Sequence, residues 1–378
     1  GQNVHINTKN SLDEETTFHW HGLKIPGHSD GGPHSVVKPG ESEEISFKVN
    51  QNAATLWFHP HPEGNTAQQV FNGLAGLIYI EDDQKKKLSL PKEYGKNDFP
   101  LIVQDKTFDE DKQLNFDEVK NEDGTMGDTL LVNGTVNPRL TVGKEKVRLR
   151  ILNGSNMRNY VFKLSNHQPF KQIASDGGLL NEPVELTELQ LTPSERAEIV
   201  IDFSQIEDDE LSLLTGDHTA VLPFKVNDTD EEKSEGLPKD MNTISISEEE
   251  MNKKVSKELV LDGMGEDVTI NGKKFDMNRI DFTQKKGETE VWEVYNKPDE
   301  MGGMIHPFHI HGTQFKVISI NGEKPPANEQ GYKDTISLDP GDRVKLAVKF
   351  EEEGIYMYHC HILEHEDNGM MGQVKVEN

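Results

Sequence analysis

The sequence lacks the features of a membrane protein and of a disulfide-linked protein. It contains one cysteine in 378 residues, which cannot form an internal disulfide and says little about the redox compartment. No apolar run approaches the roughly 18 residues that a membrane helix needs, so we expect a soluble chain without a membrane span. Hydrophobic residues make up only 33% of the chain and the mean hydropathy is -0.70, values that alone would suggest disorder.

Basic residues are also scarce. The 40 Lys and Arg residues face 67 Asp and Glu residues, which gives a net charge of -27. Such a surface repels phosphate backbones, so we do not expect nucleic acid as a partner, and solubility is the simplest meaning of the acid excess. The chain opens at Gly1 with neither a methionine nor a secretory leader, so any export signal would lie upstream. The composition therefore leaves the cellular location open.

A repeated pattern predicts folded β structure in spite of this composition. Pro39, Pro193 and Pro340 are each followed by apolar residues at the sixth, eighth and tenth positions. Alternation of period two after a turn is typical of a half-buried strand. The apolar residues are Ile45, Phe47, Val49, Ile199, Ile201, Phe203, Leu346, Val348 and Phe350. The prolines are 154 and 147 residues apart in the numbering, a spacing that suits one β-sandwich domain per copy.

A second shared segment precedes each proline, and it reads NVHINTKN, KVRLRILNGS and EVWEVYNKP in the three copies. We therefore predict an all-β chain of three tandem domains. The second and third copies also have a strand and a turn before this segment, LLVNGT and VTINGK. The first copy has no counterpart, so we expect the first domain to lack its opening strand or strands at the N-terminus.

The repeat also predicts the domain boundaries. We assign residues 1–85 to the first domain, 97–226 to the second and 251–378 to the third. Residues 227–250 are predicted to be an acidic linker, because the stretch NDTDEEKSEGLPKD is acidic and rich in turn formers. The stretch SEEEMNKKVSKEL, residues 247–259, fits either a short helix or a solvated connector, and we favour the connector because few of its residues suit a buried face.

Histidines are concentrated in four His-x-His pairs. Two pairs lie in the first domain, in FHWHG and HPH, and two lie at the corresponding places of the third, in FHIHG and HCH. The middle domain has YVFKL and LSLL there. Residues i and i+2 of a strand point to one face, so each pair presents two imidazoles side by side. We predict one cluster of eight imidazoles between the first and third domains, made by His19, His21, His59, His61, His309, His311, His359 and His361.

These eight imidazoles favour several copper ions. Imidazole suits copper, zinc, iron and nickel, and copper binds most tightly among the divalent ions. A single tetrahedral zinc ion could not use eight ligands.

The cysteine specifies a second kind of site. His306, Cys360 and His365 with Met370 form the ligand set of a blue-copper electron-transfer centre. The two histidines that flank the cysteine must point to the opposite face of the same strand. The cysteine is therefore expected to bind one copper ion while its covalent neighbours bind others, which predicts a short path for single electrons into a multi-copper cluster.

The motifs resemble those of the multicopper oxidases, particularly the three-domain bacterial laccases and copper-efflux oxidases. HWHG, HPH, HPFHIHG and HCHILEHEDNGMM carry the resemblance, and DGGP and LRILNGSNMRNY extend it over nearly the whole chain. The resemblance implies three tandem cupredoxin-like Greek-key β-sandwich domains. It also implies four copper ions, namely one of type 1, one of type 2 and a type 3 pair.

The resemblance implies a role for each ligand. A type 1 copper would be held by His306, Cys360, His365 and Met370, and a type 2 copper by His19 and His309. The type 3 pair would be held by His21, His59, His61, His311, His359 and His361. Asp30 and Glu366 match acids of the family that relay protons or tune the cluster. A turn residue and a solvated loop acid are the alternative interpretations of these two carboxyl groups.

The implied function is laccase-like oxidation of phenols and aromatic amines at type 1 copper, coupled to four-electron reduction of dioxygen to water. Copper-efflux oxidases typically carry a methionine-rich insert, whereas the eleven methionines here are dispersed. A metal-ion oxidase acting on cuprous, ferrous or manganous ions is the alternative. A cell-division scaffold without copper ligands and a two-domain copper nitrite reductase are disfavoured, because the ligands of all four pairs are present. We expect a monomer whose partners are dioxygen and either aromatic reductants or metal ions, and the family slightly favours an extracytoplasmic location over the cytoplasm.

Overall fold

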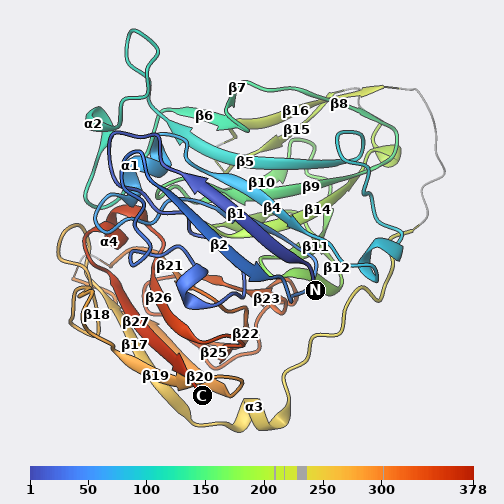
Figure 1. The fold of residues 1–378 in the computed structure, drawn as a ribbon. Helices are drawn as coiled ribbons and strands as arrows, with labels where there is room; N and C mark the ends of the chain where they lie inside the picture. The colour runs from blue at the N-terminus through green and yellow to red at the C-terminus, as the bar shows by residue number, and fades with distance from the viewer. Residues whose placement is uncertain (208–209, 217, 228–235, 301) are drawn as a thin grey trace.

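Strands dominate the chain. The computed structural model describes residues 1–207, 210–216, 218–227, 236–300 and 302–378. They form three β domains, with the first domain in front of the boundary between the second and the third (Figure 1). The predicted all-β architecture of three cupredoxin-like domains is confirmed. None of the helices in the described part of the chain has the length and apolar character needed to cross a bilayer.

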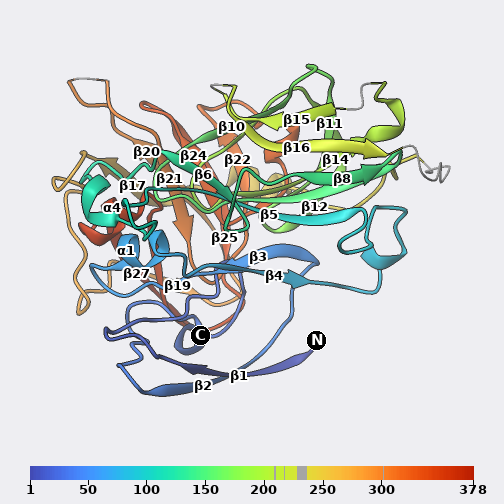
Figure 2. The same ribbon diagram turned by 90° about the horizontal axis from the view of Figure 1, so that it is seen from above.

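The first domain consists of two short antiparallel sheets. One pairs β1 (Asn3–Lys9) with β2 (Ser42–Lys48), and the other pairs β3 (Ala54–Phe58) with β4 (Gly76–Ile80). Apolar side chains such as Trp20, Ile45 and Leu56 pack between them. Seen from above, β3 and β4 lie between the β1–β2 pair and β5 of the middle domain (Figure 2). Helix α1 (Thr66–Phe71) lies between β3 and β4 in the sequence.

The middle domain is a sandwich of a five-stranded and a seven-stranded sheet. The first sheet has the order β13-β10-β15-β16-β8 and the second has the order β12-β11-β14-β9-β5-β6-β7. The first sheet contains β8 (Leu140–Gly143), β10 (Tyr160–Leu164), β13 (Leu189–Leu191), β15 (Glu210–Leu214) and β16 (Ala220–Asn227). The second contains β5 (Asp98–Lys106), β6 (Thr129–Val132), β7 (Thr135–Val136), β9 (Lys146–Asn153), β11 (Phe170–Ser175), β12 (Gly178–Leu186) and β14 (Arg196–Asp202). Helix α2 (Phe116–Val119) lies in the connection between β5 and β6.

The third domain repeats this design with a six-stranded and a five-stranded sheet. The strand orders are β18-β17-β20-β25-β22-β23 and β19-β27-β26-β21-β24. The first sheet contains β17 (Val255–Asp262), β18 (Thr269–Ile270), β20 (Thr289–Asn296), β22 (Phe315–Ile320), β23 (Tyr332–Lys333) and β25 (Arg343–Lys349). The second contains β19 (Phe282–Lys285), β21 (His306–Ile310), β24 (Thr335–Leu338), β26 (Gly354–Cys360) and β27 (Met371–Glu377). Helix α4 (Leu363–Asp367) follows β26 directly.

The sequence repeat corresponds to one strand pair in each domain. The strand that follows each proline is β2, β14 or β25, and the shared segment before the proline forms β1, β9 or β20. These strands pair antiparallel as β1–β2, β9–β14 and β20–β25. On its other side β9 pairs in parallel with β5, and β20 pairs in parallel with β17. Among the described residues, β1 pairs only with β2.

The predicted linker is more ordered than its composition suggests. Its residues 228–235 lie outside the described part of the chain. Beyond them, Met241 is 2% exposed in a core cluster of the middle domain, and the backbone of Ile244 exchanges hydrogen bonds with the Asn181 side chain.

The connector interpretation of residues 247–259 is wrong. Ser247 and Glu250 form a capping box that begins helix α3 (Glu248–Asn252). The strand β17 then starts at Val255, and Leu259 is 1% exposed. The helix has no buried residue and the strand is buried on only part of its length. Neither element therefore has a clear periodic pattern of apolar residues in the sequence.

Candidate metal centres

The four His-x-His pairs meet in one buried cluster. His19 and His59 lie on neighbouring segments of the first domain, whose backbones exchange hydrogen bonds of 2.9 and 3.2 Å. In the third domain, His309 of β21 lies opposite His359 of β26 in the antiparallel register. Strand pairing in each domain thus brings its two pairs together, and the two domains face each other across them. All eight imidazoles are at most 1% exposed.

Three imidazoles of this cluster converge through their Nε2 atoms. His359 Nε2 lies 3.2 Å from His61 Nε2 and 3.0 Å from His311 Nε2. Burial, the largest cause, lowers the pKa of His61 and His311 well below the usual value and that of His359 to about 3. Neutral imidazoles with facing nitrogens are the donor set that a metal ion requires.

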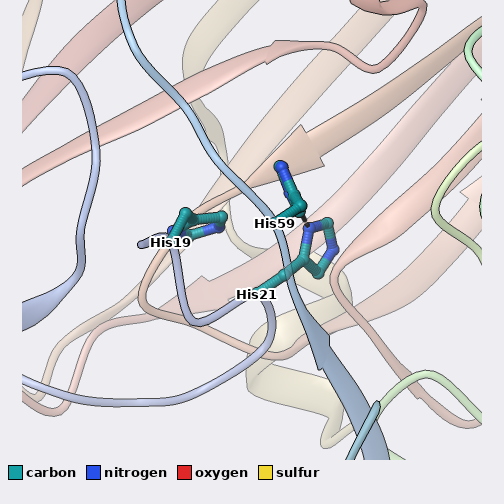
Figure 3. Close-up of side chains that lie close together, drawn as sticks. All are labelled: His19, His21 and His59. Carbon is teal, nitrogen blue, oxygen red and sulfur yellow. Dashed lines mark hydrogen bonds between the residues drawn. The ribbon is translucent and has the colours of Figure 1, made fainter. Parts of the chain in front are cut away.

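A second group contains His21, His59 and His361. Figure 3 shows His21 and His59 with a contact between their rings, in which His21 Nδ1 lies 3.3 Å from His59 Nε2. The ring centroid of His361 lies 5.2 Å from that of His21 and 5.3 Å from that of His59. Neither ring nitrogen of His361 has a hydrogen-bond partner within the described ranges. A buried polar atom without a partner is costly, and bound metal would remove that cost.

A third group is formed by His19 and His309. Their ring centroids are 5.9 Å apart. The Nε2 atoms of both rings are buried and have no hydrogen-bond partner in the described part of the chain. In both rings the other nitrogen is occupied, because His19 Nδ1 lies 2.9 Å from the Asp30 carbonyl and His309 Nδ1 lies 2.7 Å from the Asp334 carbonyl. Such outer contacts fix the orientation of a ligand ring and its tautomer.

The cysteine lies in a separate buried site. Cys360 Sγ is 3.3 Å from His306 Nδ1 and 3.7 Å from His365 Nδ1. Met370 is fully buried in the same core cluster, and its carbonyl accepts a 3.1 Å hydrogen bond from the Cys360 backbone. Burial raises the pKa of the Cys360 thiol, so the thiolate needs a cation beside it. Two imidazoles, a thiolate and a nearby thioether are the donors that blue copper uses.

Asp30 contacts two histidines of the cluster. Its Oδ2 accepts a 2.7 Å hydrogen bond from His311 Nδ1, and its carbonyl accepts one of 2.9 Å from His19. The residue also ends the short 3-10 helix η1 (Gly27–Ser29), so the turn interpretation is compatible with a role at the site. Its side chain is 3% exposed.

Glu366 lies on α4 between two other histidines. Its Oε1 is 3.3 Å from His61 Nδ1 and its Oε2 is 3.2 Å from His359 Nδ1. It is 2% exposed, so the solvated-loop interpretation of this acid does not hold. Burial, and to a lesser extent Asp367, raises the pKa of the Glu366 carboxyl well above its usual value. Burial therefore favours the protonated form of this carboxyl group.

Sequence reasoning missed Asp334. Its Oδ1 lies 2.9 Å from His21 Nε2, and the residue is fully buried. It belongs to a group of close ligand atoms with His21 and His309. It lies just before β24, separated from His21 by 313 positions, and no spacing pattern in the sequence marks it.

Both sites fit copper by the chemistry of their donors. The cluster offers imidazole nitrogens, several of which have no hydrogen-bond partner among the described residues, and the second site combines imidazole with sulfur. His306, Cys360 and His365 form one group of close ligand atoms, and the eight paired histidines supply others, except that His361 falls in none of these groups.

The chain is similar to several known proteins. Family models described as multicopper oxidase match residues 1–85, 97–228 and 238–378. The chain is 57% identical to Multicopper oxidase mco of Staphylococcus haemolyticus over 378 residues, which cover 100% of this chain and 80% of that protein. It is 35% identical to Cell division protein FtsP of Xenorhabdus nematophila over 400 residues, which cover 100% of this chain and 81% of that protein.

Solved structures show the same fold. A laccase from Pediococcus acidilactici matches with a TM-score of 0.95 and 47% identity, covering 100% of this chain and 81% of that one. A multicopper oxidase from Campylobacter jejuni, described as a metallo-oxidase, matches with a TM-score of 0.84 and 32% identity, covering 100% of this chain and 83% of that one.

Proposed function

The chain belongs to the multicopper oxidase family, and from this premise we propose that it is a laccase-like oxidase of phenols and aromatic amines. The family is one of oxidoreductases that use dioxygen as the electron acceptor and carry copper of types 1, 2 and 3. The observation that supports a laccase-like electron path is the placement of Cys360 directly between His359 and His361. One strand end thus connects the sulfur-containing site to the histidine cluster through covalent bonds.

We assign the ligands as the resemblance to the family implies. The type 1 copper would be held by His306, Cys360, His365 and Met370. The type 2 site takes the Nε2 atoms of His19 and His309. One type 3 copper takes His61, His311 and His359, and the other takes His21, His59 and His361. These groups match the convergence of nitrogens and the unpartnered ring atoms described above.

Copper bound at these residues supplies one-electron transfer and the reduction of dioxygen. The chain's own residues hold the imidazoles in place and supply protons. Asp30 orients His311 and His19 through its carboxylate and its carbonyl. Glu366, whose protonated form is favoured by burial, lies beside His61 and His359, where it could donate the protons that water formation consumes.

Metal-ion oxidation is the second candidate, and an acidic rim beside the type 1 site favours it. Asn368, which ends α4, donates to Glu122 Oε2 at 2.9 Å and to the Gly265 carbonyl at 3.3 Å. The loops joined by this residue carry exposed carboxylates close to the helix of His365. The exposed acids are Glu122, Asp123, Glu266 and Asp267. Carboxylates attract metal cations and do nothing for a neutral phenol.

Copper analysis followed by oxygen uptake tests the proposal. We expect about four copper ions per chain, a blue absorption and two EPR-visible copper species, as the ligand sets predict. Oxygen uptake should then saturate with a phenol, at a rate that added metal ions leave unchanged. Saturation by cuprous, ferrous or manganous ions without phenol turnover would favour the second candidate. A copper-loaded protein without blue absorption would contradict both.

A further inference from the structure

We propose that the middle domain, to which no copper ligand is assigned, positions the histidine cluster that binds the type 2 and type 3 copper ions. It does so through an ion pair between Arg196 and Asp334. The inference rests on the ligand assignment of the proposed function. Arg196 begins β14 of the middle domain, and Asp334 precedes β24 of the third domain. Both side chains are fully buried. The pair therefore joins two domains at a point shielded from water.

The carboxylate of Asp334 contacts a histidine from the first domain. His21 Nε2 donates to its Oδ1 at 2.9 Å, while His21 Nδ1 faces His59. If Nδ1 binds copper, Nε2 must carry the proton, and a carboxylate is the acceptor that holds this tautomer. The carbonyl of Asp334 accepts a 2.7 Å hydrogen bond from His309 Nδ1, which leaves Nε2 of that ring for copper. One residue thus orients ligands assigned to two different copper ions.

Arg196 holds this carboxylate in place from the other side. Its Nη1 and Nη2 donate to the two oxygens of Asp334 at 2.7 and 2.6 Å. The same guanidinium donates to the carbonyls of Thr55 and Asp176, at 3.2 Å each, and to that of Ser194 at 3.0 Å. A planar group with every donor engaged cannot rotate, so the orientation of the carboxylate is fixed. Lysine has the charge but not the two-pronged geometry.

The neighbouring backbone leaves no space for another arrangement. Gly22, directly after His21, has a φ of +90°. A Cβ atom there would lie 2.8 Å from Asp334 Oδ2 and 2.9 Å from Arg196 Nη2. Gln314 also donates to Asp334 Oδ2, at 2.7 Å. The ion pair therefore packs against the chain that carries the ligand, and a shift of the pair would move the imidazole.

A buried ion pair elsewhere in the middle domain provides a matched control. Arg150 donates from Nε and Nη2 to the two oxygens of Asp98, at 2.7 Å each. This pair is also buried and also has the two-pronged geometry, but it contacts none of the assigned copper ligands within the described residues. Loss of either pair would lower stability, because the remaining charge is left buried. Only loss of the first should change the copper cluster.

The experiment compares Asp334→Asn and Arg196→Lys with Asp98→Asn in the copper-loaded protein. We expect the first two variants to keep the blue type 1 absorption and to lose copper from the cluster to a chelator at about 10- to 100-fold lower chelator concentration than the wild type. Their type 2 EPR parameters should shift. Asp98→Asn should keep wild-type copper retention and EPR parameters.

Three results would overturn the inference. The first is wild-type copper retention and EPR parameters in both Asp334→Asn and Arg196→Lys. The second is equal loss of cluster copper in Asp98→Asn. The third is joint loss of type 1 and cluster copper, which would mean that the pair supports only the fold. A wild-type protein that binds no cluster copper would instead contradict the proposed function, so the two failures are distinguishable.

Discussion

At the scale of single residues, Cys360 connects the two sites. It lies opposite Phe308 in the register of β26 and β21, and its side chain packs in the core of the third domain. Its neighbour His359 lies opposite His309, on the other face of the sheet. Alternation of side chains along a strand thus sends the sulfur to one site and the imidazole to the other. Burial makes the free thiol a weak acid, so we expect a bound cation to stabilise the thiolate.

Replacement of this residue should separate the two sites experimentally. Cys360→Ser removes the thiolate, and a serine hydroxyl is not a ligand for blue copper. We expect the loss of the blue absorption and of about one copper ion per chain, with the type 2 EPR signal retained. Oxidation of the reducing substrate should fall to background. Retention of the blue colour in this variant would place the type 1 copper elsewhere.

We predict that Glu366 supplies protons for the reduction of dioxygen. Burial raises the pKa of its carboxyl well above the usual value, and the carboxyl lies beside two cluster histidines. Glu366→Gln keeps the shape and removes the transferable proton. We expect reoxidation of the reduced enzyme by dioxygen to slow by about 100-fold, while the blue absorption stays unchanged.

A neighbouring acid is the control for that measurement. Glu364 lies on the same helix, is 6% exposed, and accepts a 2.9 Å hydrogen bond from Asn156 in the middle domain. Its pKa is also raised by burial. Stopped-flow reoxidation of Glu364→Gln should match the wild type. If reoxidation slows equally in both variants, or slows in neither, Glu366 is not part of the proton path.

At the scale of elements, a buried polar network joins the first domain to the second. Thr55 of β3 donates to Glu198 Oε1 of β14 at 2.7 Å. Arg148 donates from Nε to Glu198 Oε2 at 2.8 Å, and Arg150 donates to Thr55 and Glu198. Each polar group is satisfied by a partner from a different strand, so the network specifies how the two domains pack.

This network predicts a pH dependence of stability. Burial alone raises the pKa of Glu198, but Arg148 and Arg150 and hydrogen bonds from Thr55 and Arg148 outweigh it and lower the pKa to about 2. A carboxyl with a depressed folded pKa stabilises the fold above its unfolded pKa of about 4.3, and this stabilisation is lost as the pH falls toward 2. The shift corresponds to about 3 kcal/mol.

Urea unfolding at several pH values would measure this effect. Glu198→Gln should be less stable than the wild type at pH 5, because two arginines lose their partner. The difference between the two proteins should shrink by about 3 kcal/mol between pH 5 and pH 2. A difference that does not change with pH would show that Glu198 is not ionised in the folded protein.

At the scale of the whole molecule, the histidine cluster is a joint between the first and third domains. Histidines from both domains supply the facing nitrogens, as in the 3.2 Å contact of His61 with His359. Copper bound there would hold the two domains together, and it would bind the folded chain in preference to the unfolded one. Metal binding is then part of the stability of the assembled chain.

Removal of copper should therefore lower the melting temperature. A ligand present at 1,000 times its dissociation constant stabilises the folded state by about 4 kcal/mol, so we expect the copper-free protein to melt several degrees lower by calorimetry. Reloading with copper should restore the midpoint. Added chelator should have no further effect on the copper-free protein. Equal midpoints with and without copper would contradict a bridging role.

Local sequence patterns were sufficient to predict many of the strands and the histidine pairs of this protein. The strands β2, β14 and β25 follow from period-two alternation after a proline, because one face of each strand is buried. The same periodicity predicts that His309 and His311 point to one face of their strand, and that His359 and His361 do so in theirs. The prediction for residues 247–259 was wrong because such a periodic pattern is missing there. A single turn of helix and a strand with few buried residues leave almost no periodic signal.

The sequence by itself determined the three-domain β architecture, the family and the set of candidate ligands, since each depends on residues that are close in the chain. Only the tertiary structure decided which nitrogens face one another and which groups hold the rings. Asp334 lies 2.9 Å from His21 across 313 positions, and Arg196 of the middle domain reaches Asp334 of the third domain. Such contacts depend on how separately folded sheets pack, and no local periodicity encodes that packing.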